Sequence, residues 1–364
     1  MSDILKVSCV VGARPNFIKM APLMAELLRR PRWKPQLIHT GQHYSPEMSD
    51  QFFQELQIPR PDVHLGLAGG SPTKQTADIL VALEPILDTF RPDVLIVVGD
   101  VTSTIASALT AVRLGLKVAH VEAGLRSFDR TMPEEINRIV TDSLSDFLFT
   151  SEPSGRENLE REGVADSRIF FVGNVMIDTL LRFREQAKQS NVLVQLGVEE
   201  KGYAVATLHR PANVDDPGRL TDLVGVLNRV AERLPVVFPV HPRTKNRIEE
   251  LGLGTGRLRL CPPQGYLDFL RLTSSARLVL TDSGGIQEET TILQVPCLTL
   301  RENTERPVTI TEGTNHLVGL DPERIYSVAS EVLESAPPAG DQVPQFWDGK
   351  ASVRIIDTLE QQLS

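Results

Sequence analysis

The residues best suited to chemistry in this sequence are three carboxylates, Asp100, Glu122 and Glu134. Asp100 and Glu122 each follow a short apolar run. Glu134 lies in the first turn of a predicted helix that opens with Pro133, where the helix dipole favours acidic side chains. Because ligands bind at the carboxyl ends of parallel strands, we expect the three side chains to point at one site. Converging carboxylates raise one another's pKa, so the pattern predicts acid/base chemistry.

Each carboxylate also has a structural explanation. Asp100 could be the N-cap of the helix that follows it, which is the better explanation for an isolated aspartate. Glu134 could pair with Arg138, one helical turn further along. Glu122 is harder to explain in this way, because a carboxylate directly after a buried strand needs a partner.

Two cations flank a predicted helix start in the segment GARPNFIK, residues 12–19. A dinucleotide-binding turn would carry GxGxxG at this position, and neither that pattern nor a P-loop is present. Arg14 and Lys19 could be surface cations beside a turn glycine. Their place at a strand end, next to free helix amides, favours an anion site.

Two strand ends in the second half of the chain carry a histidine close to an arginine. His209 and Arg210 follow one apolar run, and His241 precedes Pro242 and Arg243 after the next. A lone histidine is usually structural, but two such groups indicate phosphate binding.

The strongest motif of the second half is TDSGGIQEE, residues 281–289. Ser283, Gly284 and Gly285 would expose backbone amides at a helix start, which suits a diphosphate. Glu289 lies about one turn further along and could accept both ribose hydroxyls. A charged loop after the last predicted strand adds Arg306 to the substrate-binding candidates. An N-capped helix with acidic first turns would explain any one of these residues, but not the whole set.

Alternating strands and helices must position these residues. In the first half we predict strands at 5–11, 35–39, 93–98, 117–121, 147–150 and 168–172, with helices at 17–30, 47–56, 102–114, 134–144 and 155–162. In the second half we predict strands at 203–208, 236–240, 257–260, 278–281 and 296–300, with helices at 220–233, 243–251, 266–272 and 285–293. The repeated rhythm predicts an α/β protein with two Rossmann-like, doubly wound domains.

We expect an N-terminal domain over 1–173 and a C-terminal, nucleotide-binding domain over 174–351. A final helix at 352–364 is expected to pack back on the first domain. Ligands of such folds bind outside the carboxyl ends of the strands, so we expect the site in a central cleft between the domains.

Composition excludes several classes of function. The 364 residues include 41% hydrophobic and 23% charged residues, as in ordinary soluble proteins, and the net charge is −9. That charge argues against general nucleic-acid or anionic-membrane binding. The sequence shows no signal peptide, no apolar run near the roughly 20 residues of a membrane span, and no CxxC or HExxH spacing for zinc. Three scattered cysteines indicate buried free thiols and a cytoplasmic protein.

Taken together, the motifs resemble those of the non-hydrolysing UDP-N-acetylglucosamine 2-epimerases nearly from end to end. The resemblance is carried by GARPNFIKMAPL, TGQHYSPEM, GDVTST, HVEAGLRSFD, MPEEINRIVTD, the His-Arg strand end, HPRT, TDSGGIQEE and RENTERP. It implies the two-domain fold of one large class of glycosyltransferases (glycosyltransferase B), no metal, no nicotinamide or other cofactor, and a homodimer. It also implies a nucleotide-sugar substrate and a setting in surface-polysaccharide precursor synthesis.

The resemblance implies a mechanism as well. Anti elimination of UDP with loss of the C2 proton would give 2-acetamidoglucal, and UDP would add back after protonation of the opposite face. The implied acid/base group is Asp100, Glu122 and Glu134. The implied anion and leaving-group contacts are Arg14, Lys19 and His209, of which Lys19 and His209 also count as catalytic. Diphosphate and ribose would be held by Ser283, Gly284 and Glu289.

Some positions depart from the better-known bacterial pattern. Asn16 and Phe17 replace an acidic and a small residue, Pro211 and Ala212 precede Asn213, and the segment after His43 is longer. In regulated bacterial members a second, activating UDP-GlcNAc binds at positions that correspond here to Gln42, His43, Arg210 and His241. At these positions the sequence is also similar to relatives that act on UDP-2,3-diacetamido uronic acids.

Three rival functions remain. A hydrolysing 2-epimerase would release UDP and free N-acetylmannosamine. A glycosyltransferase of the same fold would need an acceptor and no triplet of carboxylates. A silent sugar-nucleotide sensor would keep Ser283 and Glu289 but lose carboxylates, and this sequence keeps all three.

Overall fold

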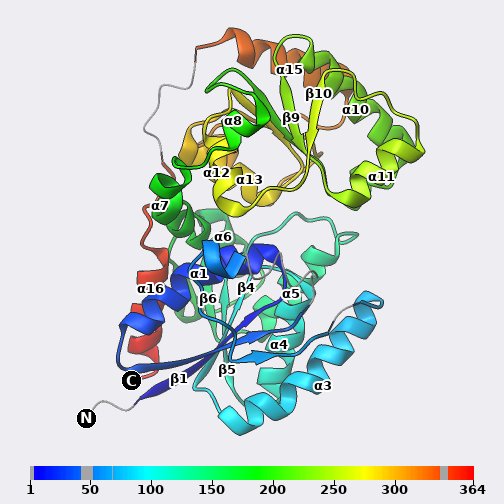
Figure 1. The fold of residues 1–364 in the computed structure, drawn as a ribbon. Helices are drawn as coiled ribbons and strands as arrows, with labels where there is room; N and C mark the ends of the chain where they lie inside the picture. Colours follow the sequence, from blue (N-terminus) through cyan, green and yellow to red (C-terminus); the bar gives the residue numbers. More distant parts are fainter. Residues whose placement is uncertain (1–3, 42–51, 68, 337–342) are drawn as a thin grey trace. The chain divides into compact units, whose positions relative to one another are not determined.

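The computed structural model describes residues 4–41, 52–67, 69–336 and 343–364. The chain forms two compact units, which can be followed by colour in Figure 1. Unit 1 comprises Met1–Arg182 and Gln345–Ser364, and unit 2 comprises Phe183–Pro344. Each unit contains a parallel sheet with helices between its strands, so the expected fold class of two doubly wound α/β units is confirmed.

The sheet of unit 1 has the strand order β3-β2-β1-β4-β5-β6-β7, and its strands pair in parallel. Its strands are β1 (Leu5–Val11), β2 (Trp33–His39), β3 (Val63–His64), β4 (Val94–Val98), β5 (Lys117–Val121), β6 (Phe147–Thr150) and β7 (Ile169–Phe171). Every residue of β4 is buried, as expected for a parallel sheet that is covered on both faces.

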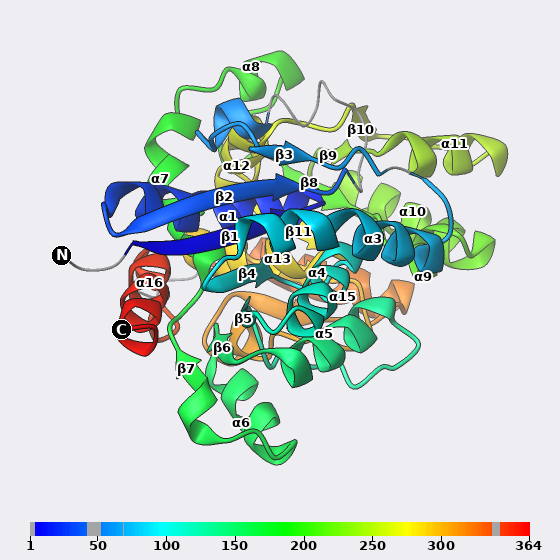
Figure 2. The same ribbon diagram turned by 90° about the horizontal axis from the view of Figure 1, so that it is seen from below.

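The helices of unit 1 cover the two faces of this sheet. They are α1 (Arg14–Arg29), α3 (Pro72–Phe90), α4 (Thr102–Arg113), α5 (Pro133–Leu144), α6 (Pro153–Arg161), α7 (Val175–Ala187) and α16 (Ala351–Gln362). Helix α3 contacts α4, which contacts α5 (Figure 2), while α1 packs against α16 on the other side of the sheet (Figure 1). We predicted no element at α3, where Pro85 interrupts the helical pattern.

Unit 2 repeats the plan with the strand order β10-β9-β8-β11-β12-β13. Its strands are β8 (Ala204–Thr207), β9 (Val236–Pro239), β10 (Leu258–Cys261), β11 (Leu278–Thr281), β12 (Cys297–Thr299) and β13 (Asn315–Leu317). Its helices are α8 (Val192–Leu196), α9 (Pro211–Val214), α10 (Pro217–Ala231), α11 (Pro242–Glu250), α12 (Tyr266–Ser274), α13 (Gly284–Leu293), α14 (Val308–Thr311) and α15 (Pro322–Glu334). Leucines and valines of α10 form the core with β8, β9 and β11.

Strand order reverses direction at one point in each sheet. In unit 1 the reversal lies between β1 and β4, and in unit 2 it lies between β8 and β11. The loops that leave the carboxyl ends of such strands diverge and form the usual ligand site of this fold. The candidate residues Arg14 and Asp100 follow β1 and β4, and His209 and Ser283 follow β8 and β11.

The first unit ends after Arg182, inside helix α7, whereas we expected the first domain to end at residue 173. A continuous helix gives the sequence no turn signal at this point.

The chain returns to unit 1 at Gln345, seven positions before the expected 352. The buried Trp347 explains the earlier return, because its indole Nε1 donates to the carbonyl of Ser151 at 2.9 Å. The buried carboxylate of Asp178 then accepts the backbone N–H of Ser352 at 2.8 Å at the start of α16.

All three cysteines, Cys9, Cys261 and Cys297, are free and buried. Burial raises the pKa of the Cys261 thiol to about 11, which keeps it protonated and unreactive at neutral pH. In the described part of the chain, no helix combines the length and the apolar character that crossing a membrane requires.

Candidate functional site

The centre of the candidate site in unit 1 is a buried ion pair between Lys19 of α1 and Glu122, the first residue after β5. Both side chains are 7% exposed. Glu122 has a positive φ of 75°, which a non-glycine residue adopts only at a cost in energy. A Cβ atom at Gly99 would lie 2.9 Å from Lys19 Nζ, so the glycine lets the turn after β4 approach the pair.

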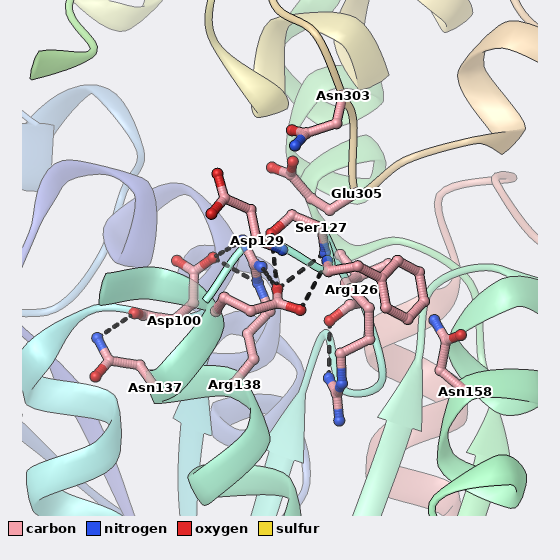
Figure 3. A network of polar contacts seen from close by, with 12 residues as sticks. Asp100, Arg126, Ser127, Asp129, Asn137, Arg138, Asn158, Asn303 and Glu305 are labelled. Atoms are coloured by element: carbon pink, nitrogen blue, oxygen red, sulfur yellow. Dashed lines mark hydrogen bonds and ion pairs between the residues drawn. The ribbon is translucent and has the colours of Figure 1, made fainter. Parts of the chain in front are cut away.

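Asp100 lies on that same turn, and the first turns of α5 hold it in place (Figure 3). Its Oδ2 accepts hydrogen bonds from Arg138 Nε at 2.9 Å and Arg138 Nη2 at 2.8 Å. The side-chain amide of Asn137 donates to its backbone carbonyl at 2.8 Å. The Asp100 side chain remains 22% exposed, so the carboxylate is fixed in position and accessible to solvent.

The two glutamates of the first turn of α5 have different surroundings. Glu135 is 1% exposed and accepts the backbone N–H groups of Ser127 and Phe128, both at 2.9 Å. It also binds Arg138 Nη1 at 2.6 Å. Glu134 is half-buried and makes no hydrogen bond or ion pair within the described ranges of the chain. The suggested helix pair of Glu134 with Arg138 is therefore not formed, because Arg138 binds Asp100 and Glu135 instead.

This difference predicts opposite effects of two neighbouring substitutions. Glu135→Gln should lower the free energy of unfolding by about 1–3 kcal/mol, because an amide cannot accept all the buried hydrogen bonds of the carboxylate, although Arg138 keeps its pair with Asp100. Glu134→Gln should change it by less than about 0.5 kcal/mol. Urea unfolding followed by tryptophan fluorescence measures both effects, since Trp33 and Trp347, the only two tryptophans, are buried in unit 1. Equal losses in the two variants would contradict the assignment.

The expected anion site at the start of α1 is held together by Asn16, which we had noted only as a departure from the bacterial pattern. Asn16 Oδ1 accepts the N–H groups of Gly12 at 3.3 Å and Ala13 at 3.1 Å. Its amide donates to the carbonyl of Val98 at 2.8 Å, so it ties the end of β1 to the end of β4. Arg14 lies 4.6 Å above the ring of Phe52.

In unit 2 a buried carboxylate that we did not predict, Asp282, organises the turn after β8. It accepts the backbone N–H of His209 at 3.1 Å, that of Arg210 at 3.0 Å and the side-chain amide of Asn213 at 3.2 Å. It also binds His209 Nδ1 at 2.7 Å, while the histidine side chain stays 56% exposed. Burial would raise the pKa of Asp282, but His209 and the backbone donors outweigh it and lower the pKa.

The expected diphosphate motif begins α13, with Ser283 as its N-cap and Gly284 as its first residue. Ser283 makes no side-chain capping bond. A Cβ at Gly284 would lie 2.4 Å from Arg306 Nη1, so glycine lets the arginine lie against the helix start. Arg306 is 5% exposed, and its Nε lies 2.8 Å from Glu288 Oε1. Gly285 follows in the same turn, and Glu289, 4% exposed, lies one turn further along the helix.

Of the four residues suggested for a second nucleotide-sugar, the structure describes Arg210 and His241. Gln42 and His43 lie outside the described residues. Arg210 donates from Nε to the carbonyl of Asp282 at 3.0 Å. His241 is exposed, and its Nδ1 caps α11 by accepting the N–H of Arg243 at 3.3 Å, which is a structural function.

Within the ranges that the structure describes, no group of three or more His, Cys, Asp or Glu side chains is placed to hold a metal ion. The polar groups gathered at the strand ends are instead carboxylates, cations and helix amides. Such groups can move protons and bind a phosphorylated ligand.

The chain is similar to known proteins both in sequence and in structure. The sequence model of the family described as UDP-N-acetylglucosamine 2-epimerase matches residues 25–360. A UDP-N-acetylglucosamine 2-epimerase homolog of Methanococcus maripaludis is 43% identical, over 98% of this chain and 99% of its own length. The UDP-2,3-diacetamido-2,3-dideoxy-D-glucuronate 2-epimerase of Pseudomonas aeruginosa is 40% identical, again over 98% and 99%. The crystal structure of the Methanocaldococcus jannaschii UDP-GlcNAc 2-epimerase, in complex with UDP-GlcNAc and UDP, matches with a TM-score of 0.91 and 40% identity. That match covers 98% of this chain and 100% of the other.

Proposed function

The chain belongs to the UDP-N-acetylglucosamine 2-epimerase family, and we propose that it interconverts UDP-GlcNAc and UDP-ManNAc without hydrolysis. The observation that carries this proposal is the placement of two carboxylates at adjacent strand ends. Glu122 is buried against Lys19 after β5, and Asp100 is fixed but accessible after β4. A reaction that removes a proton from one face of a carbon and returns one to the other needs such a group.

In the proposed reaction the C2–H bond and the bond from C1 to the UDP oxygen break together. The C2 proton passes to a carboxylate, UDP leaves as an anion, and 2-acetamidoglucal remains. A second acid then delivers a proton to the opposite face of C2, and UDP adds back at C1. We assign the acid/base group to Asp100, Glu122 and Glu134. Elimination followed by addition leaves the oxidation state unchanged, so the reaction requires no nicotinamide.

We assign UDP binding chiefly to unit 2. The exposed ring of His209 would stabilise the departing diphosphate, and Asp282 would orient that ring. The start of α13, at Ser283, Gly284 and Gly285, would bind phosphate oxygens with its amides. Further substrate contacts are assigned to Glu289 for the ribose, and to Arg14, Lys19 and Arg306 for the diphosphate.

We further propose a cytoplasmic homodimer as the working form. The buried free cysteines are consistent with a reducing compartment.

Reaction in heavy water tests the function. UDP-GlcNAc incubated with the enzyme in D₂O should yield both UDP-GlcNAc and UDP-ManNAc with deuterium at C2, because elimination discards the original proton and solvent replaces it. Proton NMR of the anomeric and C2 signals provides the readout. Epimerisation with full retention of the C2 hydrogen would exclude the elimination mechanism.

The same experiment separates the rival functions. Free UDP and free ManNAc as main products would indicate a hydrolysing enzyme, and transfer only when an acceptor sugar is added would indicate a glycosyltransferase. Inertness towards UDP-GlcNAc, with exchange in a UDP-2,3-diacetamido uronic acid, would keep the mechanism and change the substrate to that of the P. aeruginosa relative.

A further inference from the structure

His120 is a fully buried histidine between two hydrogen-bond acceptors. Its Nδ1 lies 2.6 Å from Asp142 Oδ1, and its Nε2 lies 2.8 Å from the backbone carbonyl of Gly99. The side chain is 0% exposed, so no water replaces either partner. A carbonyl oxygen accepts hydrogen bonds and never donates them, which requires a proton on Nε2.

Asp142, which holds the other side of the ring, is itself fixed by further donors. Its Oδ2 accepts the N–H of Gly124 at 3.1 Å and forms an ion pair with Arg126 Nη2 at 2.7 Å. Burial alone would raise the pKa of Asp142, but the charges and hydrogen bonds of His120 and Arg126 outweigh it and lower the pKa. Both ring nitrogens of His120 are therefore held, Nε2 by the carbonyl of Gly99 and Nδ1 by Asp142.

Arg126 extends this cluster, because it binds Asp142 and also forms an ion pair with Glu162 at 2.7 Å. The residues that pair with His120 on the neighbouring strands, Val97 and Leu148, are apolar and add no charge.

The contact of His120 with Gly99 fixes the turn that carries Asp100. Gly99 has a positive φ of 66°, and its N–H donates to the carbonyl of Val121 at 3.0 Å. Its carbonyl is held by His120, and a Cβ atom added to it would lie 2.9 Å from Lys19 Nζ. Asp142 meanwhile holds Gly124, two residues after Glu122, so the pair of His120 and Asp142 reaches the turns that bear Asp100 and Glu122.

We infer that His120 is a positioning residue, and that its ring, held by Asp142, fixes the Gly99 peptide and hence the places of Asp100 and Glu122. The inference rests on the proposed function for its effect on turnover. It does not depend on that function for the hydrogen bonds of the ring.

Two substitutions separate the two hydrogen bonds. A glutamine amide reaches the place of a histidine Nε2, so His120→Gln keeps the donor to Gly99. An asparagine amide reaches the place of Nδ1, so His120→Asn keeps only the donor to Asp142. We expect His120→Asn to lower kcat by about tenfold or more, with KM for UDP-GlcNAc within about twofold, and His120→Gln to retain several times more activity than His120→Asn.

The matched control is the exposed His316 of β13. Its change to asparagine or glutamine should leave kcat and KM unaltered. Normal kcat in His120→Asn, or a loss confined to KM, would overturn the positioning role.

A measurement on the unaltered protein tests the hydrogen bond to Gly99 even if the variants do not fold. Spectra of ¹⁵N-labelled histidine should show one of the seven side chains with a proton on Nε2 that exchanges slowly with solvent, because this ring is fully buried and donates to a carbonyl. The absence of such a ring would overturn the inference. Failure of the proposed function would appear separately, as an unaltered enzyme that does not act on UDP-GlcNAc.

Discussion

Replacing Glu122 by glutamine is expected to lower kcat by at least about a hundredfold, because an amide neither takes up nor returns the C2 proton. The dissociation constant of UDP should change by less than about twofold, since the nucleotide contacts are assigned to other residues. Initial rates at saturating UDP-GlcNAc and calorimetric titration with UDP measure the two effects. Near-normal turnover in Glu122→Gln would remove the residue from the acid/base group.

The buried ion pair calls for a control on stability. Glu122→Gln leaves the Lys19 ammonium buried without its anion, which costs about 3–5 kcal/mol of unfolding free energy. Adding Lys19→Met removes the second charge as well, and replacing both members of a buried pair is often nearly neutral. We therefore expect the double variant to recover stability but not turnover. Recovery of both would show that the single variant was inactive only because its fold was damaged.

Asp282→Asn should lower kcat by about tenfold or more, because the asparagine orients His209 less well than the carboxylate. If Asp282 acts on the reaction only through His209, a double variant with His209→Ala should be no slower than His209→Ala alone. Additive losses in kcat would give Asp282 a separate function.

The pH dependence of stability gives an independent measure of the same variant. The folded-state pKa of Asp282 lies below the ordinary 3.8, so its contribution to stability is present above about pH 4 and is lost as pH falls through the folded value. The unaltered protein should therefore be more stable than Asp282→Asn at neutral pH, and the difference should shrink below about pH 4. A difference that stays constant with pH would show that the carboxylate charge contributes nothing.

The sequence was sufficient to find residues that directly follow apolar runs. Asp100, Glu122 and His209 stand at strand ends, and the alternation of strands and helices is enough to bring such ends together. Short elements were missed, because β3 and β13 contain too few residues to show a period.

Residues whose function is to hold another residue were also missed. Asp282 contacts His209 from 73 positions away, and Asn16 contacts Val98 from 82 positions away, and neither separation leaves a local pattern. Glu134 and Glu135 are equivalent in the sequence, and only the rotation of α5 about its axis determines which of them is buried.

The order of synthesis follows from the two-part composition of unit 1. Its last piece, Gln345–Ser364, is separated from the remainder by all of unit 2, so the ribosome completes unit 2 before unit 1 has its full set of residues. Until then, a nascent chain carries α1 without the covering helix α16, and Asp178 without the backbone donors of Ser352. Part of the apolar surface of unit 1 therefore stays in water or on a chaperone until its last residues are translated, after unit 2.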